Sequence, residues 1–325
     1  MAFALFSAFE TGIIYAIMAL GVYLTFRMLD FPDLTVDGSF VTGAAVAVVS
    51  ITAGVPAILA SFYALIAGFI AGMCTGLLHT KGKINALLSG ILMMIALYSI
   101  NLRIMGRPNL GVPVGESFFD QVRTFTATYG IDSFFNSIFS FLGLDRSWGI
   151  ILVMILITFF LKFLLDLFLK TEIGIALRAT GDNKKMIRSL SANTDWLIIL
   201  GLGISNALVA FSGALIAQHG GFADAGMGVG LIIIGLASVI IGEALFGTKT
   251  IFRATLAIIG GAIVYRIVVT FALRVDFLEA GDVRLITALI VIAALITPKI
   301  IQKQRNKKRL KQKRLQQSKE VSHHA

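Results

Sequence analysis

The sequence predicts an all-α polytopic membrane protein with eight or nine transmembrane helices, some of them broken. Three observations predict this fold class. Of 325 residues, 57% are apolar and 14% are charged, and the mean hydropathy is +0.88. Long apolar runs recur along the chain, and 32 glycines allow the close helix packing that membrane proteins use. A water-soluble enzyme is disfavoured, because soluble domains carry about a quarter of charged residues.

A transmembrane helix needs about 20 apolar residues, with roughly 17–25 tolerated. The second candidate is the weakest, because it is short and rich in Gly, Ala, Ser and Thr, so the count is eight or nine. Lys162 and Asp166 stand four apart in the fifth candidate and are expected to pair on one helix face. The candidate spans are 3–26, 37–53, 56–79, 86–104, 149–169, 196–217, 228–246, 252–273 and 283–299.

The C-terminal tail fixes the expected orientation. Residues 299–325 hold ten Lys or Arg and one acid, so the positive-inside rule places the C-terminus in the cytoplasm. We expect a transmembrane domain over 1–300 and a basic, disordered tail over 301–325. This tail would lie along anionic membrane lipids rather than bind nucleic acid. Counting back, loop 105–148 lies outside and loop 170–195 inside.

The outer loop 105–148 is too long for a simple connection. Aromatic residues within 131–144 predict a helix in the membrane interface, either as a platform for an outside partner or as a cover over the bundle. The single cysteine, Cys74, and four scattered histidines predict no disulfide, metal site or cofactor. A glycine-rich run resembles a phosphate loop, but Thr248 separates its second glycine from Lys249 and a membrane helix precedes it, so nucleotide binding is not expected.

The first candidate site follows the first span. Pro32 disfavours helical geometry at the residue before it and interrupts the span. Acids between apolar spans are costly at membrane depth and usually mark a pathway. We expect Asp37 to cap the next helix. The segment is either a broken helix whose Asp33, Asp37 and Ser39 line a translocation path or a capped surface loop.

The second candidate site, residues 218–230, is glycine-rich and again lies between spans. An offset of 191 residues aligns Phe31 with Phe222 and Asp33 with Asp224. The expected topology gives the two segments opposite orientations, as an inverted repeat requires. Phe222 and Asp224 are therefore also candidate pathway residues.

The third candidate site is the cytoplasmic segment 171–194. The pattern predicts a short helix, a break at Gly181 and a second short helix capped near Asp182. Met186, Ile187 and Leu190 would form one apolar face beside basic residues. Such a helix can dock into a groove of a partner protein.

Three stretches carry a resemblance to a known family. They are the run from Gly12 to Gly21 leading to the Leu29–Ser39 sequence LDFPDLTVDGS, the loop from Gly174 to Asn183, and the segment from Gly235 to Glu243. Together they resemble permease subunits of branched-chain amino-acid-type ABC importers, and most closely the subgroup labelled tryptophan/tyrosine ABC transport permeases. The similarity covers about 1–300.

The resemblance implies the fold of type II ABC importer permeases, built from broken helices. It implies a bacterial inner-membrane subunit that works as a permease dimer with a cytoplasmic ABC ATPase and an extracytoplasmic substrate-binding lipoprotein. ATP hydrolysis would occur in the ATPase, so this chain would not be an enzyme. The solute would be an amino acid, with aromatic side chains as one option. By the same resemblance, the segment that contacts the ATPase contains Gly174, Arg178, Gly181, Asp182, Asn183, Met186 and Leu190.

The expected mechanism is alternating access driven by ATP binding. Two rivals remain open. One is an ion-coupled secondary transporter that uses the acids near 30–37, and the other is a membrane scaffold. The 171–194 segment argues against both, because neither needs a docking helix there.

Overall fold

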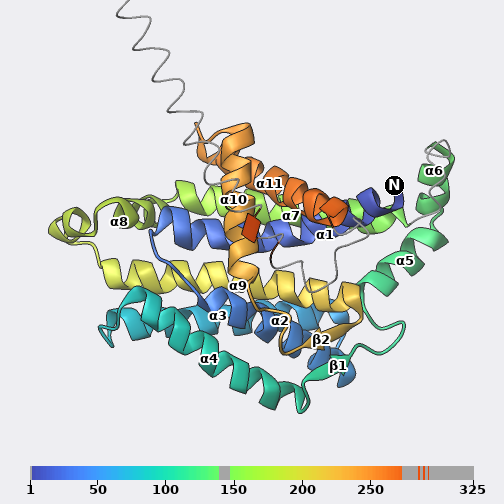
Figure 1. Cartoon of the computed structure of the whole chain (residues 1–325), viewed down its shortest axis with the longest axis horizontal. Coiled ribbons are helices and arrows are strands. Elements are labelled where there is room, and N and C mark those ends of the chain that lie inside the picture. Colours follow the sequence, from blue (N-terminus) through green and yellow to red (C-terminus); the bar gives the residue numbers. More distant parts are fainter. Residues whose placement is uncertain (1, 139–146, 273–284, 286–287, 290–291, 293–325) are drawn as a thin grey trace, which may run out of the picture.

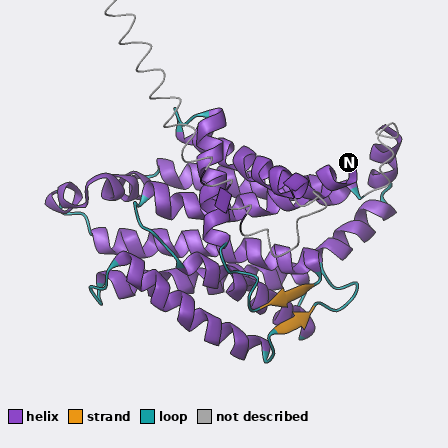
Figure 2. Ribbon diagram, in the orientation of Figure 1, coloured by secondary structure: helices purple, strands orange, loops and turns teal. Residues whose placement is uncertain are grey.

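The computed structural model describes residues 2–138, 147–272, 285, 288–289 and 292. This part of the chain is almost entirely helical, with one short two-stranded ribbon (Figure 2). Its elements are α1 (Ala2–Tyr23), the π-helical turn η1 (Leu24–Met28), α2 (Thr35–Thr52), α3 (Ala57–Thr80), α4 (Ala86–Met105), β1 (Asn109–Gly111), α5 (Phe118–Thr128), α6 (Ile131–Ile138), α7 (Trp148–Lys170), α8 (Glu172–Ser189), α9 (Thr194–Gly220), β2 (Phe222–Asp224), α10 (Leu231–Phe246) and α11 (Ile251–Ala272).

Seven of these helices are long and apolar enough to cross a membrane, namely α1 with η1, α2, α3, α4, α7, α9 and α11. The helix α10 is apolar but has only 16 residues. These eight helices coincide with the first eight spans expected from the sequence. The expected span 283–299, apart from single residues, and the basic tail lie outside the described residues. The all-α polytopic fold is confirmed over the part described.

The weakest expected span forms one of the two most buried membrane helices. Most of α2 is buried, and so is most of α9, which packs against it. A Cβ atom at Gly43 in α2 would overlap the backbone of Ala210 in α9. The small residues that lowered the apolar signal of this span therefore let two helix backbones approach closely.

The helix packing follows an internal repeat. With an offset of 191 residues, α1 aligns in sequence with α9, α2 with α10, and α3 with α11. The helix α1 packs against α9, α10 and α11, and α9 packs against α1, α2 and α3. Within each half, the second and third helices also pack together. The contacts of one half thus recur in the other, which supports the repeat expected from the sequence.

The long helices have two distinct ends. The helix α8 lies at one end, which we call the α8 end, while β1, β2, α5 and α6 lie at the opposite end, the strand end (Figure 1). The strands pair antiparallel, with Leu110 opposite Ala223. At this end, α5 buries Phe119 and Val122 against the bundle, so it acts as a cover. The helix α6 leaves Phe134 exposed, and the rest of the expected interfacial helix lies beyond the described residues.

The expected charge pair in α7 is confirmed. Lys162 and Asp166 form a buried ion pair on one helix face. Asp166 also accepts a hydrogen bond from the Thr255 hydroxyl of α11 at 2.7 Å. The Lys162 ammonium lies 3.4 Å from the ring centre of Phe252. The pair therefore joins α7 to α11.

Candidate functional site

The chain between α1 and α2 is a break in which buried and exposed side chains alternate. After η1 the backbone leaves helical geometry, and Asp30 has a positive φ of 51°. Pro32 and the turn at Asp30 explain why the first span cannot continue. Leu29 and Phe31 are buried, and Asp33 is only 1% exposed. Asp30 and Pro32 are exposed, so the structure has a broken helix whose alternate side chains pack into the bundle. The pathway role of this segment stays a prediction.

Asp33 fastens the start of α2 to the middle of α9. One carboxylate oxygen accepts from the backbone N–H of Thr35 at 3.0 Å, and the other accepts from the Asn206 side-chain amide at 2.7 Å. Asn206 lies twelve residues into α9, roughly 18 Å along its axis. The Thr35 hydroxyl lies 2.8 Å from that of Thr75 in α3. The Asp33 carboxylate thus joins α2 to α9, and Thr35 extends this contact to α3.

Asp37 does not cap its own helix, so that expectation was wrong. It lies inside the first turn of α2, where its own backbone is already helical. Its two oxygens instead accept from the backbone N–H groups of Gly230 and Ile232, both at 2.8 Å. A carboxylate at a helix N-terminus accepts hydrogen bonds from the free N–H groups there, and its negative charge interacts favourably with the positive end of the helix dipole. Asp37 therefore caps α10, 193 residues away in the sequence.

Ser39 lies in α2 next to these acids and is fully buried. Its hydroxyl has no hydrogen-bond partner among the described residues, and the same holds for the side-chain oxygens of Asn101 and Asn206. Most buried polar atoms are paired, so three unpaired oxygens on α2, α4 and α9 mark the bundle around the break as unusually polar.

The other two pathway candidates lie elsewhere. Phe222 and Asp224 belong to β2 at the strand end, where Asp224 pairs with Asn109 of β1. Phe222 is 46% exposed, and the Asp224 carboxylate accepts from the N–H of Gly226 in its own turn. The structure brings Asp33, Asp37 and Ser39 together at the start of α2, but it does not place Phe222 and Asp224 with them.

The expected break in the 171–194 segment lies two residues later than expected. The helix α8 is continuous through Gly181 and kinks at Asn183, whose backbone is non-helical. The Asn183 side chain accepts from the N–H of Met186 at 3.1 Å, so Asn183, and not Asp182, caps the second part. At the start of α8, the N–H of Gly174 donates to the Thr171 hydroxyl at 3.2 Å.

Gly181 has a different role from the one expected. A Cβ atom there would overlap the carbonyl oxygen of Met28 and press on Leu29. These are the last residue of η1 and the first of the break. Only a glycine lets α8 come this close to the broken helix, so Gly181 makes the direct contact between the two candidate sites.

The second part of α8 presents a smaller apolar surface than expected. Met186 and Leu190 are 50% and 69% exposed, but Ile187 is 6% exposed and packs inward, so the three do not form one face. Arg188 fixes this part by binding Asp195 at 2.8 Å, with Lys184 at 3.7 Å from the same carboxylate. Burial lowers the pKa of the Lys184 ammonium, and the Asp195 charge partly opposes this.

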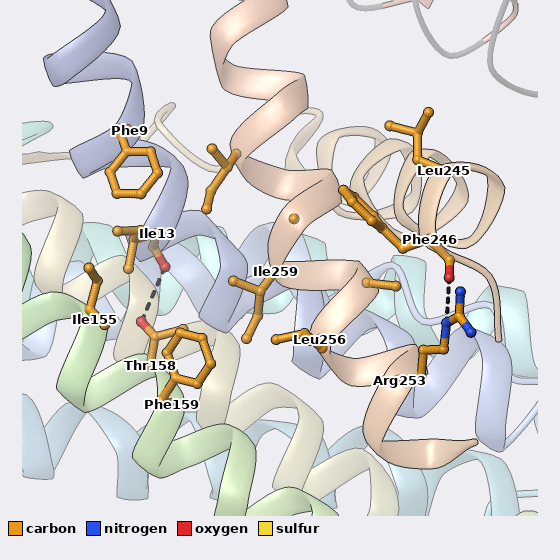
Figure 3. A pocket seen from close by; sticks show the side chains of 13 residues that line it. Phe9, Ile13, Ile155, Thr158, Phe159, Leu245, Phe246, Arg253, Leu256 and Ile259 are labelled. Atoms are coloured by element: carbon orange, nitrogen blue, oxygen red, sulfur yellow. Dashed lines mark hydrogen bonds between the residues drawn. The ribbon is translucent and has the colours of Figure 1, made fainter. Parts of the chain in front are cut away.

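Arg178 and Asp182 line a polar cavity at the α8 end, next to Arg27 and Glu243. A second hollow, between α1, α7, α10 and α11, is an apolar groove of about 490 Å³ (Figure 3). Its polar groups are largely engaged, because the Thr158 hydroxyl donates to the Ile13 carbonyl and Arg253 donates to the Phe246 carbonyl. The groove therefore offers little to a charged solute.

Sequence reasoning missed the long-range partners of these residues. Asn206 and Gly230 come from the second half of the repeat, and no local pattern pairs them with Asp33 and Asp37. The 191-residue offset was the available signal. It aligns α2 with α10 in sequence. In the structure the first turn of α2 contacts the segment just before α10, because a Cβ atom at Gly228 would overlap the Asp37 carbonyl oxygen.

Comparisons with known proteins agree with this architecture. The family model described as branched-chain amino acid transport system / permease component matches residues 4–296. A tyrosine transport system permease protein of Clostridioides difficile (strain R20291) is 43% identical over 291 residues, which is 90% of each chain. An uncharacterized protein of Rickettsia prowazekii (strain Madrid E) is 37% identical over 245 residues, or 74% of this chain and 78% of the relative. No solved structure matches the chain. The chain is a multi-pass membrane protein and belongs to the family of permease components of branched-chain amino acid transport systems.

Proposed function

We propose that this chain is the transmembrane subunit of an ATP-driven importer in the bacterial inner membrane. It would work as a homodimer with a cytoplasmic ABC ATPase and an extracytoplasmic binding lipoprotein. The α8 end would face the cytoplasm, together with the basic tail, because the Lys and Arg residues gather there. The solute is an amino acid. The named relative is a tyrosine permease, which makes tyrosine the first solute to test.

One observation carries this proposal. The helix α8 has an exposed apolar tip, at Met186 and Leu190, and its Gly181 lies directly against the break at Met28 and Leu29. A protein that docks on the tip and moves α8 would therefore push on the broken helix. An ATPase that closes around ATP supplies such a movement. The residues from Gly174 to Leu190 would form the coupling element, with Asp33, Asp37 and Ser39 beside the path.

The test is reconstitution of the permease with its ATPase and binding lipoprotein in vesicles that contain ATP. We expect uptake of radiolabelled tyrosine, tryptophan or leucine that needs both partners and ATP hydrolysis, and that a catalytically inactive ATPase abolishes it. Ionophores that collapse ion gradients should not change the initial rate. Uptake by the permease without ATP that is lost with ionophores would instead favour an ion-coupled transporter that uses Asp33.

A further inference from the structure

The polar cavity at the α8 end has a volume of about 450 Å³, within the range of about 300–1,000 Å³ that is typical of small-molecule sites. Its walls come from several elements, including α10 and the start of α11. Tyr23 and Arg27 come from the end of α1 and η1, Arg178 and Asp182 from α8, and Thr248, Lys249 and Thr250 from the loop between α10 and α11. The cavity therefore lies between the broken helix and the expected coupling element.

The charges in this cavity divide into one satisfied pair and three free groups. Arg27 binds Glu243 at 3.0 Å. Arg178, Lys249 and Asp182 form no ion pair or side-chain hydrogen bond within the part of the chain that the structure describes. Two cations and one carboxylate thus line one polar space, where Arg178 is half-buried and Lys249 and Asp182 are exposed to solvent.

A small ligand that pairs with both the cations and the carboxylate of this cavity needs an anionic group and a cationic group. A carboxylate matches a guanidinium and an ammonium, since charge-assisted hydrogen bonds are the strongest available to it. An ammonium group matches the Asp182 carboxylate. A free α-amino acid carries both groups one carbon apart, and the hydroxyl groups of Tyr23, Thr248 and Thr250 add further polar contacts.

We propose that this cavity binds a free amino acid zwitterion from the α8 side, with its carboxylate on Arg178 and Lys249 and its ammonium on Asp182. This proposal rests on the proposed function, because the ligand is then the transported product. A bound product would bridge η1, α8 and the α10–α11 loop. Since α8 must move relative to the break during transport, such a bridge slows the cycle as product accumulates.

The direct test measures binding to the full-length permease in lipid nanodiscs, without ATPase or binding protein. The probes are L-tyrosine, L-tryptophan and L-leucine, each compared with L-tyrosine methyl ester, N-acetyl-L-tyrosine and inorganic phosphate. We expect at least one amino acid to bind, and its ester and acetyl forms to bind about tenfold more weakly or worse, because each lacks one charge. Equal binding of phosphate and amino acid, or unchanged binding of either derivative, would overturn the proposal.

The variants Lys249→Gln and Asp182→Asn should each weaken binding about tenfold or more. Lys185→Gln is the matched control, since Lys185 is exposed on the same helix and does not line the cavity. Thermal unfolding checks that all three fold. Wild-type affinity in both cavity variants would contradict the assignment.

The regulatory consequence is tested in the complete complex, in vesicles loaded with ATP. Preloading the α8 side with unlabelled amino acid should lower the initial uptake rate, and Lys249→Gln should remove most of that inhibition. Normal uptake without product binding or inhibition would overturn this inference and leave the proposed function intact. Amino acid binding in nanodiscs without any ATP-dependent uptake would overturn the proposed function and leave the binding site in place.

Discussion

Ser205 in α9 donates a hydrogen bond to the carbonyl oxygen of Gly21 in α1, at 2.7 Å. Ser212 makes the same kind of bond to Ile14, at 2.8 Å. The offset of 191 residues aligns Ile14 with Ser205 and Gly21 with Ser212. The repeat therefore relates the bond between Ser205 and Gly21 to the bond between Ser212 and Ile14. Helices α1 and α9 are thus antiparallel and related by an approximate two-fold axis, which is the arrangement of an inverted repeat.

This relationship predicts matched effects at the two serines. Ser205→Ala and Ser212→Ala should each lower the free energy of unfolding by about 0.6 kcal/mol, the average for interhelical hydrogen bonds in membrane proteins. Unfolding in mixed micelles measures both. Ser133→Ala is the control, since among the described residues that hydroxyl bonds within its own exposed turn, to the Gly130 carbonyl. A cost at one serine without a cost at the other would contradict the two-fold relation.

Gly181→Val should separate ATP hydrolysis from transport. The added side chain overlaps the Met28 carbonyl, so α8 must move away from the break, at a cost of about 1–3 kcal/mol. We expect normal insertion, ATPase activity that no longer responds to solute, and little uptake in reconstituted vesicles. Ile66→Val, on the exposed face of α3 and outside the coupling element, should behave as wild type. Unchanged uptake and stimulation in Gly181→Val would refute α8 as the coupling element.

Asp37→Asn tests the cap on α10. Asparagine keeps one acceptor but turns an amide N–H toward a second backbone N–H, so either Gly230 or Ile232 loses its partner. The negative charge at the helix start is lost as well. We expect the free energy of unfolding to fall by about 1–2 kcal/mol. Asp30→Asn is the matched control, because Asp30 is exposed in the same segment. Equal stability of both variants would show that the cap is dispensable.

Local patterns predicted the eight spans that the structure describes, because the length and apolar content of a span need no partner. They also predicted the break at Pro32 and the pair of Lys162 with Asp166, both of which depend on neighbours in sequence. They failed for Asp37, whose cap is satisfied by a helix 193 residues away, and for Gly181, whose role depends on the backbone of η1. A glycine in a short amphipathic segment is compatible both with a break and with a close approach to another helix, and the local sequence does not distinguish the two.

The buried pair in α7 should show strong coupling. Asp166→Leu leaves the Lys162 ammonium buried without its partner, and Lys162→Met strands the carboxylate, so each should cost about 3–5 kcal/mol. The double variant should recover most of this loss, because two apolar side chains of similar size need no partner. Unfolding of the four proteins gives the double-mutant cycle. Additive losses would mean that Thr255 and Phe252, and not the ion pair, satisfy these charges.

The pathway proposal is sharpest at Ser39. Its hydroxyl is buried and has no partner among the described residues, and cysteine is close to serine in size, so Ser39→Cys should fold. In a Cys74→Ser background, this thiol should be protected from a small water-soluble reagent in the conformation described here. If α2 lines the path, alternating access must expose it in another state, so trapping the ATPase with nucleotide should raise its reaction rate by tenfold or more. Thr124→Cys, exposed on α5, should react at a similar rate in both states. A Ser39→Cys thiol that stays protected in every nucleotide state, in a complex that transports normally, would show that α2 packs the bundle without facing the solute.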